Sequence, residues 1–328
     1  MKALIVGGGM AANLHCKVLK GHGVTVAGIC DVYLPAAQAL AEKHGGEAFD
    51  DLAVALQTDV DFAVICTPSG THAKLAIQAM EVGKNVVVEK PLALNPADCQ
   101  AVIRAQQRTG KLCAPISQLR FSPMYRRVKE CLEKGGLGTL IMASLSMKYY
   151  RSREYYGGWK GTWAMDGGEL MNQGIHGIDI MCGLLGKPVT VSGKVATRYH
   201  NIEAEDTAVA ALTFPGGMLG TIDSSTAINR YKPRRLEICG SDGLIVAEED
   251  RIVLAEGVEL ESDAFSEYQG SSDPRNIGTG LHSLIYENIL AAMEDKATLE
   301  YTTRDAADTV QVICAINESS KTGKTIQL

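Results

Sequence analysis

A glycine-rich turn near the start of the chain constrains its fold more than any other feature. The segment LIVGGGMAANLH begins with an apolar run and continues as a helical pattern after the turn. Gly7, Gly9 and Ala12 form a G-x-G-x-x-A pattern, whose glycines permit a tight turn and close approach of a pyrophosphate to the backbone. The next apolar run, VTVAGIC, ends in Asp31, where a carboxylate binds the ribose hydroxyls of a dinucleotide. The pattern therefore predicts a dinucleotide-binding unit.

Two simpler interpretations remain open for these residues. A glycine turn also occurs in α/β proteins that bind no dinucleotide, and Asp31 can be a solvated acid at a strand end. The complete order of strand, turn, helix and acid favours the dinucleotide. No arginine follows Asp31 until far downstream, so nothing would neutralise a 2′-phosphate. NAD is therefore expected, and NADP is disfavoured.

The first third of the chain alternates short apolar runs with helical patterns. The helical patterns span residues 11–20, 35–44, 71–82 and 96–109. Continuous apolar strands separated by amphipathic helices indicate a parallel sheet covered on both faces. This alternation predicts a doubly wound Rossmann domain over residues 1–118.

The period changes from about residue 137 onward. Longer β-type runs such as LIMASLSMKYY, TAVAALTF and MLGTIDSST are joined by turn signals such as FPGGM and GSDG. We expect a large, mostly antiparallel sheet with helices on one face, which makes residues 119–328 an α+β domain for substrate binding and oligomerisation. Two domains also suit a chain of 328 residues. The polar, glycine-rich segment 261–280 predicts a long loop.

Composition excludes several classes of partner. A net charge of -6 without any basic run argues against nucleic acid, and no segment approaches the ~20 apolar residues of a membrane span. The start, MKALIVGGGM, has too short an apolar run for a signal peptide. Nine scattered cysteines with no C-x-x-C pair suggest neither a disulfide framework nor a metal site, so we expect a cytoplasmic protein with a small-molecule substrate.

Two further segments follow strands of the Rossmann domain and are expected to border the nicotinamide. In an open α/β sheet, ligands bind beyond the carboxyl ends of the strands. The segments CTPSGTH and EKPLA place candidate residues there, and with the glycine turn the predicted cofactor site comprises Gly7, Gly9, Met10, Ala12, Asp31, Thr67, Pro68, His72, Glu89 and Lys90. The simpler interpretation of Lys90 is an exposed lysine paired with Glu89.

The segment NQGIHGID, residues 172–179, brings polar side chains to one side of an apolar helix. Asn172, His176 and Asp179 share one sector at about 100° per residue. An aromatic-rich stretch, residues 148–168, precedes this helix, and aromatic faces with cations suit a sugar ring. A buried core histidine and a subunit interface are the alternative interpretations.

These motifs together resemble the Gfo/Idh/MocA family, named for glucose-fructose oxidoreductase and inositol dehydrogenase. The resemblance covers the whole chain and rests on the glycine turn, CTPSGTH, EKPLA, SQLRFSPMY and DGGELMNQGIHGID. It implies hydride exchange between a nicotinamide and a sugar or cyclic polyol, and a homodimer or homotetramer formed through the open C-terminal sheet. Lys90 looks like the family's active-site lysine, and His176 looks like its catalytic histidine.

The resemblance is imperfect at Asn172, where the family's inositol dehydrogenases have an aspartate. An amide cannot accept a proton from imidazole, although its carbonyl can orient the ring. Asp179 could supply the missing carboxylate to His176 or instead bind backbone amides. The NQGIH form looks closer to family members that act on sugars or nucleotide-linked sugars.

The leading hypothesis is an NAD-dependent dehydrogenase acting on a secondary alcohol of a sugar, sugar derivative or cyclitol. The predicted catalytic residues are Lys90, His176 and Asn172, and the predicted substrate-binding residues are Lys90, Arg120, Tyr150, Trp163, Asn172 and His176. Arg120 can equally be a hinge or packing residue. The alternatives are an NAD-dependent glycoside hydrolase that acts through transient oxidation and a non-catalytic NAD or sugar sensor.

Overall fold

The computed structural model describes residues 1–230, 232–260 and 278–328. These residues form two compact units: unit 1 takes in residues 1–118 and 279–307, and unit 2 takes in the described residues of 119–278 together with 308–328. The loop predicted over 261–280 falls almost entirely outside the described residues. The sequence placed segment 279–307 in the second domain, whereas in the structure it groups with unit 1.

Helix α8 explains this grouping, because it packs on the first helix of unit 1. The hydroxyl of Ser283 in α8 (Gly280–Met293) lies 2.9 Å from Nε2 of His22, which follows α1 (Met10–Gly21). One face of α8 is buried, with Leu281, Ile285 and Ile289 each at most 7% exposed. An apolar helix face of this kind must be covered by a neighbour, and α1 provides part of that cover.

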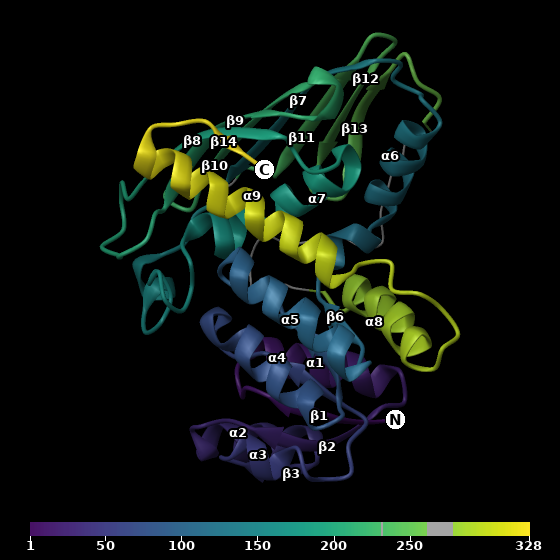
Figure 1. The fold of residues 1–328 in the computed structure, drawn as a ribbon, viewed down its shortest axis with the longest axis vertical. Helices are drawn as coiled ribbons and strands as arrows, with labels where there is room; N and C mark the ends of the chain where they lie inside the picture. Colours follow the sequence, from purple (N-terminus) through teal and green to yellow (C-terminus); the bar gives the residue numbers. More distant parts are fainter. Residues whose placement is uncertain (231, 261–277) are drawn as a thin grey trace. The chain divides into compact units, whose positions relative to one another are not determined.

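Unit 1 is built on a six-stranded parallel sheet in the order β3-β2-β1-β4-β5-β6 (Figure 1). Its strands are β1 (Lys2–Val6), β2 (Thr25–Cys30), β3 (Glu47–Phe49), β4 (Phe62–Ile65), β5 (Asn85–Val88) and β6 (Cys113–Pro115). Its further helices are α2 (Leu34–His44), α3 (Leu52–Ala55), α4 (His72–Glu81) and α5 (Pro96–Thr109). This arrangement confirms the predicted Rossmann fold.

The order of these strands fixes where a ligand can bind in unit 1. The chain runs outward from β1 through β2 to β3, and then returns to the other side of β1 as β4. The loops that leave β1 and β4 therefore diverge, which opens a crevice at the carboxyl ends of these two strands. The strands themselves are fully buried runs, as Leu4, Ile5 and Val64 at 0% exposure show.

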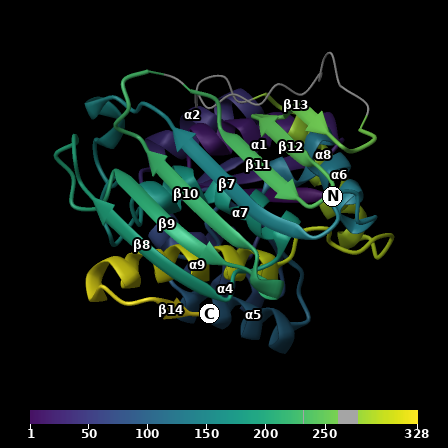
Figure 2. The same ribbon diagram turned by 90° about the horizontal axis from the view of Figure 1, so that it is seen from above.

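Unit 2 is built on an eight-stranded sheet in the order β13-β12-β11-β7-β10-β9-β8-β14 (Figure 2). Strands β7 and β10 pair in parallel and the remaining neighbours pair antiparallel, which confirms the mostly antiparallel sheet. The strands are β7 (Leu140–Lys148), β8 (Thr190–Ala196), β9 (Thr207–Thr213), β10 (Leu219–Ser225), β11 (Arg235–Gly240), β12 (Leu244–Glu248), β13 (Arg251–Glu256) and β14 (Ile326–Gln327). Its helices are α6 (Pro123–Glu133), α7 (Ile175–Leu185) and the later part of α9 (Thr303–Thr322).

Helix α7 lies against one face of this sheet, as Figure 2 shows. A Cβ added at Gly177 would collide with the side chains of Met147 and Leu145 on β7, so the glycine is what lets the helix approach the strand. Strand β9 alternates accordingly, since Ala208, Ala210 and Leu212 are buried.

The opposite face of the sheet carries apolar side chains that remain exposed. Val209 of β9 is 52% exposed, Leu219 of β10 is 53% exposed, and Met142 of β7, which pairs with Leu219, is 45% exposed. Among the helices in the described parts of the chain, none combines the length and apolar character that crossing a membrane requires.

Candidate active site

Position 7, in the glycine turn after β1, can be occupied only by a residue without a side chain. Gly7 has a φ of +108°, and a Cβ placed there would come within 2.7 Å of the carbonyl oxygen of Cys66, which follows β4. The same turn is held to β2, because the backbone N–H of Gly7 donates to the carbonyl of Cys30 at 2.7 Å. The first turn of the chain is therefore tight because it passes between the ends of two neighbouring strands.

The start of α1 offers backbone donors to an anion. Gly9 is the N-cap residue of α1. Among residues 1–230, 232–260 and 278–328, no side chain caps this helix end, and nothing lies within 4 Å of the place where a Cβ of Gly9 would be. Free N–H groups and the helix dipole favour a phosphate at such a place. Met10 is 61% exposed beside this opening, while Ala12 is fully buried. The turn thus fits the pyrophosphate of a dinucleotide.

The carboxylate of Asp31 lies at the mouth of this turn. Its Oδ2 accepts from the backbone N–H of Gly8 at 2.6 Å, and its Oδ1 accepts from that of Tyr33 at 2.8 Å. Each carboxylate oxygen can accept a second hydrogen bond, so the group is oriented and still able to bind ribose hydroxyls. The next residues, Val32 and Tyr33, are 96% and 66% exposed and bring no positive charge to a 2′-phosphate.

One buried imidazole joins the ends of β4 and β5. His72, at 1% exposure, lies 2.8 Å through Nε2 from the carbonyl oxygen of Thr67 and 2.7 Å through Nδ1 from that of Pro91. Burial lowers the pKa of His72, and the two carbonyls oppose that shift. His72 therefore ties the segment of Thr67 and Pro68 to the segment of Lys90, which is a supporting role beside the expected nicotinamide position.

Glu89 is held by a network that reaches into α8. Its Oε1 lies 2.9 Å from Nε2 of His15, whose Nδ1 lies 2.8 Å from the hydroxyl of Tyr286. Burial favours the neutral carboxyl of Glu89, but the bond and charge of His15, with smaller help from His282 and Lys90, hold its pKa well below the usual range. His15 and Tyr286 were not singled out from the sequence, because a histidine and a tyrosine on helices far apart in the chain give no motif.

Lys90 follows β5 directly and is fixed through its backbone. Its N–H donates to Oε2 of Glu89 at 3.0 Å, and the Lys90–Pro91 peptide bond is cis. The side chain of Lys90 is half-buried. The same carboxylate that binds His15 therefore positions the predicted catalytic lysine at the carboxyl end of the sheet.

In unit 2, the predicted catalytic histidine begins a regular helix that follows an irregular turn. Leu170–Gly174 form a π-helical turn, and α7 continues from Ile175. The prediction that Asn172 shares one sector of the helix with His176 and Asp179 assumed about 100° per residue. That spacing does not apply at Asn172, because a π-helical turn is wider. His176 is half-buried, whereas Asn172 and Asp179 are buried at 7% and 2% exposure. Turns of this kind inside helices are frequent at functional sites.

Asn172 is held by three neighbouring side chains. Its amide nitrogen donates to the carboxylate of Asp166, and its carbonyl accepts from the hydroxyl of Tyr155 at 2.9 Å and from the amide of Gln173 at 2.6 Å. Asp166 is fully buried, and its second oxygen accepts from the backbone N–H of Gly161 at 2.7 Å. The amide of Asn172 is thus bound to a carboxylate, that of Asp166, which belongs to the preceding loop.

Asp179 is paired with Arg120 inside unit 2. Nε and Nη2 of Arg120 donate to the two carboxylate oxygens at 2.8 and 2.9 Å, and the hydroxyl of Thr309 donates to Oδ1 at 2.9 Å. A third guanidinium nitrogen donates to the hydroxyl of Tyr125 at 3.2 Å. These bonds account for a carboxylate on a buried helix face and give Arg120 a packing role. A further role of Asp179 in holding His176 stays a prediction.

The aromatic stretch divides into buried and more accessible members. Tyr149 is 3% exposed, while Tyr150 is 36% exposed with its ring centroid 6.4 Å from that of Tyr199. Trp163 is half-buried, and Nζ of Lys321 lies 5.4 Å from its ring centroid. Substrate contacts by Tyr150 and Trp163 stay predictions.

Two buried glutamates, Glu169 and Glu205, lie next to the π-helical turn. Oε1 of Glu205 accepts from the backbone N–H of Leu170 at 3.0 Å, and Oε1 of Glu169 accepts from the hydroxyl of Ser224 at 2.5 Å. Both side chains are at most 2% exposed, and Oε2 of each has no hydrogen-bond partner within the described part of the chain. Burial raises the pKa of each carboxyl to about 8. The turn that precedes His176 is therefore held in part by carboxyls that keep their protons at neutral pH.

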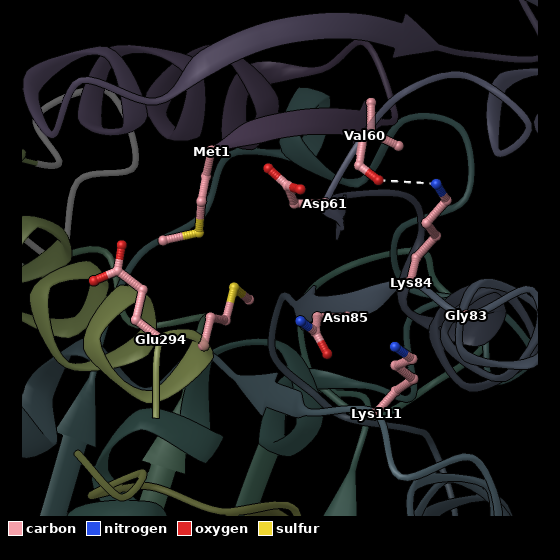
Figure 3. A pocket seen from close by; sticks show the side chains of 9 residues that line it. Met1, Val60, Asp61, Gly83, Lys84, Asn85, Lys111 and Glu294 are labelled. Carbon is pink, nitrogen blue, oxygen red and sulfur yellow. Dashed lines mark hydrogen bonds between the residues drawn. The ribbon is translucent and has the colours of Figure 1, made fainter. Parts of the chain in front are cut away.

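A depression elsewhere in unit 1 holds none of the predicted site residues. Figure 3 shows Val60, Asp61, Lys84, Asn85 and Lys111 around it, and Nζ of Lys84 donates to the carbonyl of Val60 at 2.8 Å. Asp61 precedes β4 and Asn85 begins β5, so this depression lies at the amino ends of the strands. Among the described residues, no group of three His, Cys, Asp or Glu side chains is arranged to hold a metal ion.

Two family models match the chain. Residues 1–116 match the model described as "Oxidoreductase family, NAD-binding Rossmann fold", and residues 125–246 match the GFO/IDH/MocA C-terminal domain. An inositol 2-dehydrogenase of Rhizobium meliloti (strain 1021) is 27% identical over 259 residues, which cover 77% of each chain. A myo-inositol 2-dehydrogenase of Thermotoga maritima is 27% identical over 284 residues, 82% of this chain and 81% of the relative.

Solved structures agree with this assignment. The WlbA dehydrogenase of Bordetella pertussis, in complex with NADH and UDP-GlcNAcA, superposes with a TM-score of 0.91 at 28% identity and covers 100% of this chain and 98% of its own. The glycine turn, the open start of α1 and the oriented Asp31 carboxylate suit the cofactor that the first family model names. The chain therefore belongs to the Gfo/Idh/MocA family and is an NAD-binding oxidoreductase.

Proposed function

We propose that this protein is a dehydrogenase that acts on a ring secondary alcohol of a sugar derivative or cyclitol, with NAD bound to unit 1 and substrate bound to unit 2. The observation that carries the proposal is Lys90, a half-buried lysine fixed by Glu89 at the carboxyl end of the NAD-binding sheet. The named inositol dehydrogenases and the WlbA dehydrogenase support the class of substrate.

In the proposed reaction, His176 and Lys90 act on one substrate hydroxyl. NAD supplies the hydride acceptor when it is bound. The imidazole of His176 takes the proton of the hydroxyl, which suits a side chain whose ordinary pKa lies close to neutrality. The ammonium of Lys90 donates a hydrogen bond to the same oxygen and stabilises the negative charge that develops on it.

Asn172 serves as a positioning residue in this proposal. Its amide is fixed by Asp166, Tyr155 and Gln173, so it can hold a substrate hydroxyl or the His176 ring in one orientation. It takes up no proton, because an amide has no basic site near neutral pH. Asp166 then supplies the negative charge near this position that Asn172 itself lacks.

Among the candidate substrates, a nucleotide-linked sugar has the broadest support. The WlbA dehydrogenase, whose structure contains UDP-GlcNAcA, matches the whole of this chain at 28% identity. The inositol dehydrogenases match about four fifths of it at 27%. Because the named relatives are dehydrogenases, they do not favour glycoside hydrolysis or a non-catalytic sensor.

The exposed face of the large sheet is the proposed site of self-association. Met142, Val209 and Leu219 together present an apolar surface on neighbouring strands, and such surfaces mark interfaces. A second copy of the chain would bury them and give a homodimer or homotetramer. Light scattering of V209E is expected to show a smaller species than the unaltered protein.

The experiment that tests the catalytic assignment is the substitution Lys90→Met. Purified protein with NAD is offered inositols, hexoses and UDP-sugars, with NADH followed by absorbance and products identified by mass spectrometry. We expect kcat of Lys90→Met to fall by about 10²- to 10⁴-fold on the preferred substrate, while calorimetry shows unchanged NAD binding. Lys74→Met, at an exposed position on α4, is the matched control and is expected to keep full turnover. Full turnover by Lys90→Met would overturn the assignment.

A further inference from the structure

Lys160 occupies an unusual position in the loop that precedes the π-helical turn. Its Nζ lies 3.9 Å from the ring centroid of Tyr155 and 5.9 Å from that of Trp159. The side chain is half-buried. An ammonium held over an aromatic face is attracted by the ring, and the contact strengthens as water is removed. The two rings therefore fix the place of this charge.

The surroundings of Lys160 do not neutralise it. In the described parts of the chain, no carboxylate oxygen lies within 4.0 Å of its Nζ. The nearby carboxylate of Asp166 is bound instead to Gly161 and Asn172. Burial lowers the pKa of Lys160, Asp166 raises it, and the guanidinium of Arg151 lowers it again. A half-buried cation without a paired anion is costly unless a ligand supplies the anion.

The ring beneath Lys160 connects it to the active-site helix. The hydroxyl of Tyr155 donates to the carbonyl of Asn172, which lies four residues before His176. Tyr155 therefore binds the π-helical turn through its hydroxyl, while the face of its ring contacts the ammonium of Lys160.

Other cations in this region repeat the arrangement. The guanidinium carbon of Arg153 lies 5.3 Å from the ring centroid of Tyr199, and Nζ of Lys321 lies 5.4 Å from that of Trp163. Neither has a carboxylate within ion-pair distance among the described residues. Positive charge therefore accumulates on the aromatic stretch of a protein whose net charge is -6. Such local excess attracts an anionic ligand.

We propose that Lys160 binds an anionic group of the substrate, a carboxylate or phosphate carried by the sugar, and thereby selects charged over neutral sugars. This inference rests on the proposed function, because it places the substrate in unit 2. Lys160 belongs to the aromatic stretch, residues 148–168, that the sequence already suggests for sugar binding, and the structure distinguishes it among the cations of that stretch by the 3.9 Å between its Nζ and the ring centroid of Tyr155. A solvated lysine with no ligand would give no such selection.

The test compares Lys160→Met and Lys160→Arg with the unaltered holoenzyme on two pairs of probes. UDP-glucuronate against UDP-glucose reports on a carboxylate, and glucose 6-phosphate against glucose reports on a phosphate. Binding to the enzyme–NADH complex is measured by calorimetry, and kcat/KM is measured wherever turnover occurs. Lys324→Met, at an exposed position of unit 2, is the matched control.

We expect Lys160→Met to weaken binding of the member of one pair whose sugar carries the carboxylate or phosphate by about 10- to 100-fold, with the member whose sugar lacks that group changed less than about threefold. Lys160→Arg is expected to keep most of the preference, because the positive charge remains. The pair that responds identifies the anionic group as carboxylate or phosphate. An unaltered protein with no charge preference, or a preference that survives Lys160→Met, would overturn the inference. Selective binding without turnover would leave the inference standing and count against the proposed function alone.

Discussion

Glutamates that are shielded from solvent have pKa values shifted in opposite directions in the two units. In unit 1, Glu89 has His15 on one oxygen and the backbone N–H of Lys90 on the other, and its pKa is held well below the usual range. In unit 2, Glu169 and Glu205 each have donors on one oxygen only among the residues that the structure describes, and burial raises their pKa values to about 8.

The difference shows that neighbouring charges and hydrogen bonds decide the protonation state of a buried carboxyl. Desolvation is the largest influence in all three cases and favours the neutral form. The hydrogen bond and charge of His15, with the charges of His282 and Lys90, outweigh it at Glu89, while at Glu169 and Glu205 the neighbouring carboxylates add to it. Unit 1 consequently keeps a negative charge beside Lys90, whereas unit 2 keeps neutral carboxyls under the turn that precedes His176.

The largest effect is expected for Glu89→Gln. The amide keeps the size of the side chain but removes its charge, and its NH₂ group must face either His15 or the N–H of Lys90 as a second donor. Breaking a buried charged pair in this way costs about 3 kcal/mol of the free energy of unfolding. Urea unfolding at pH 7 measures it.

The control for this substitution is Glu81→Gln on α4. Glu81 is 53% exposed and pairs with the exposed Arg108, so we expect a change within about 0.5 kcal/mol. A loss below about 1 kcal/mol for Glu89→Gln would mean that Glu89 is not held as a carboxylate, and the contrast between the units would disappear.

Glu169→Gln is expected to change the free energy of unfolding in the opposite direction to Glu89→Gln and by a smaller amount. An amide replaces a carboxyl that is neutral in the folded protein, so stability below pH 4.5, where the unfolded carboxyl is protonated as well, should change by less than about 1 kcal/mol. The folded carboxyl titrates at about 8 and the ordinary value is 4.5. The protonated carboxyl of Glu169 therefore makes its full contribution to the free energy of unfolding below pH 4.5, and this contribution is lost as the pH rises through 8.

The measurement for Glu169→Gln is the free energy of unfolding at pH 6 and at pH 9. The unaltered protein should lose about 2 kcal/mol more than the variant over this range, because only the unaltered side chain must ionise. Glu130→Gln, at an exposed position on α6, should follow the unaltered protein. Parallel pH curves for Glu169→Gln and the unaltered protein would contradict a raised pKa in unit 2.

The sequence revealed unit 1 more completely than unit 2, for a physical reason. A dinucleotide site needs a glycine between two strand ends and an acid after the second strand, and these demands fall on fixed positions such as Gly7 and Asp31. The parallel sheet, the NAD cofactor and the family could therefore be predicted from short motifs. The support of Glu89 by Tyr286 could not, because those residues are 197 positions apart and meet only after α8 packs on α1.

The candidate site of unit 2 depends on contacts that a helical pattern does not describe. A regular helix was expected through Asn172, whereas Leu170–Gly174 form a π-helical turn whose first N–H, that of Leu170, is bound by Glu205. Asp166 reaches Asn172 from a loop, which no periodicity indicates. The mostly antiparallel sheet was predictable because alternating apolar residues specify it strand by strand. The polar interior of the unit was not predictable, since it is fixed by tertiary packing.

The smallest effect is expected for Tyr286→Phe, which isolates one link of the unit 1 network. A carboxylate only accepts hydrogen bonds, so Nε2 of His15 donates to Glu89, and Nδ1 of the same ring lies 2.8 Å from the Tyr286 hydroxyl. Burial raises the pKa of Tyr286 well above its usual range, so the hydroxyl keeps its proton. Removing it deletes a single buried hydrogen bond and leaves the ring packing intact, for a loss of about 1 kcal/mol in urea unfolding.

The pH dependence of this variant sharpens the contrast between the units. Because His15 and Lys90 still bind Glu89 when the hydroxyl is gone, the loss for Tyr286→Phe should be the same at pH 6 and pH 9. Tyr33→Phe, at a position 66% exposed, should show no loss at either pH. A loss near 3 kcal/mol, equal to that of Glu89→Gln, would show that the charge of Glu89 depends on the whole chain of bonds through Tyr286 and not on its two direct donors.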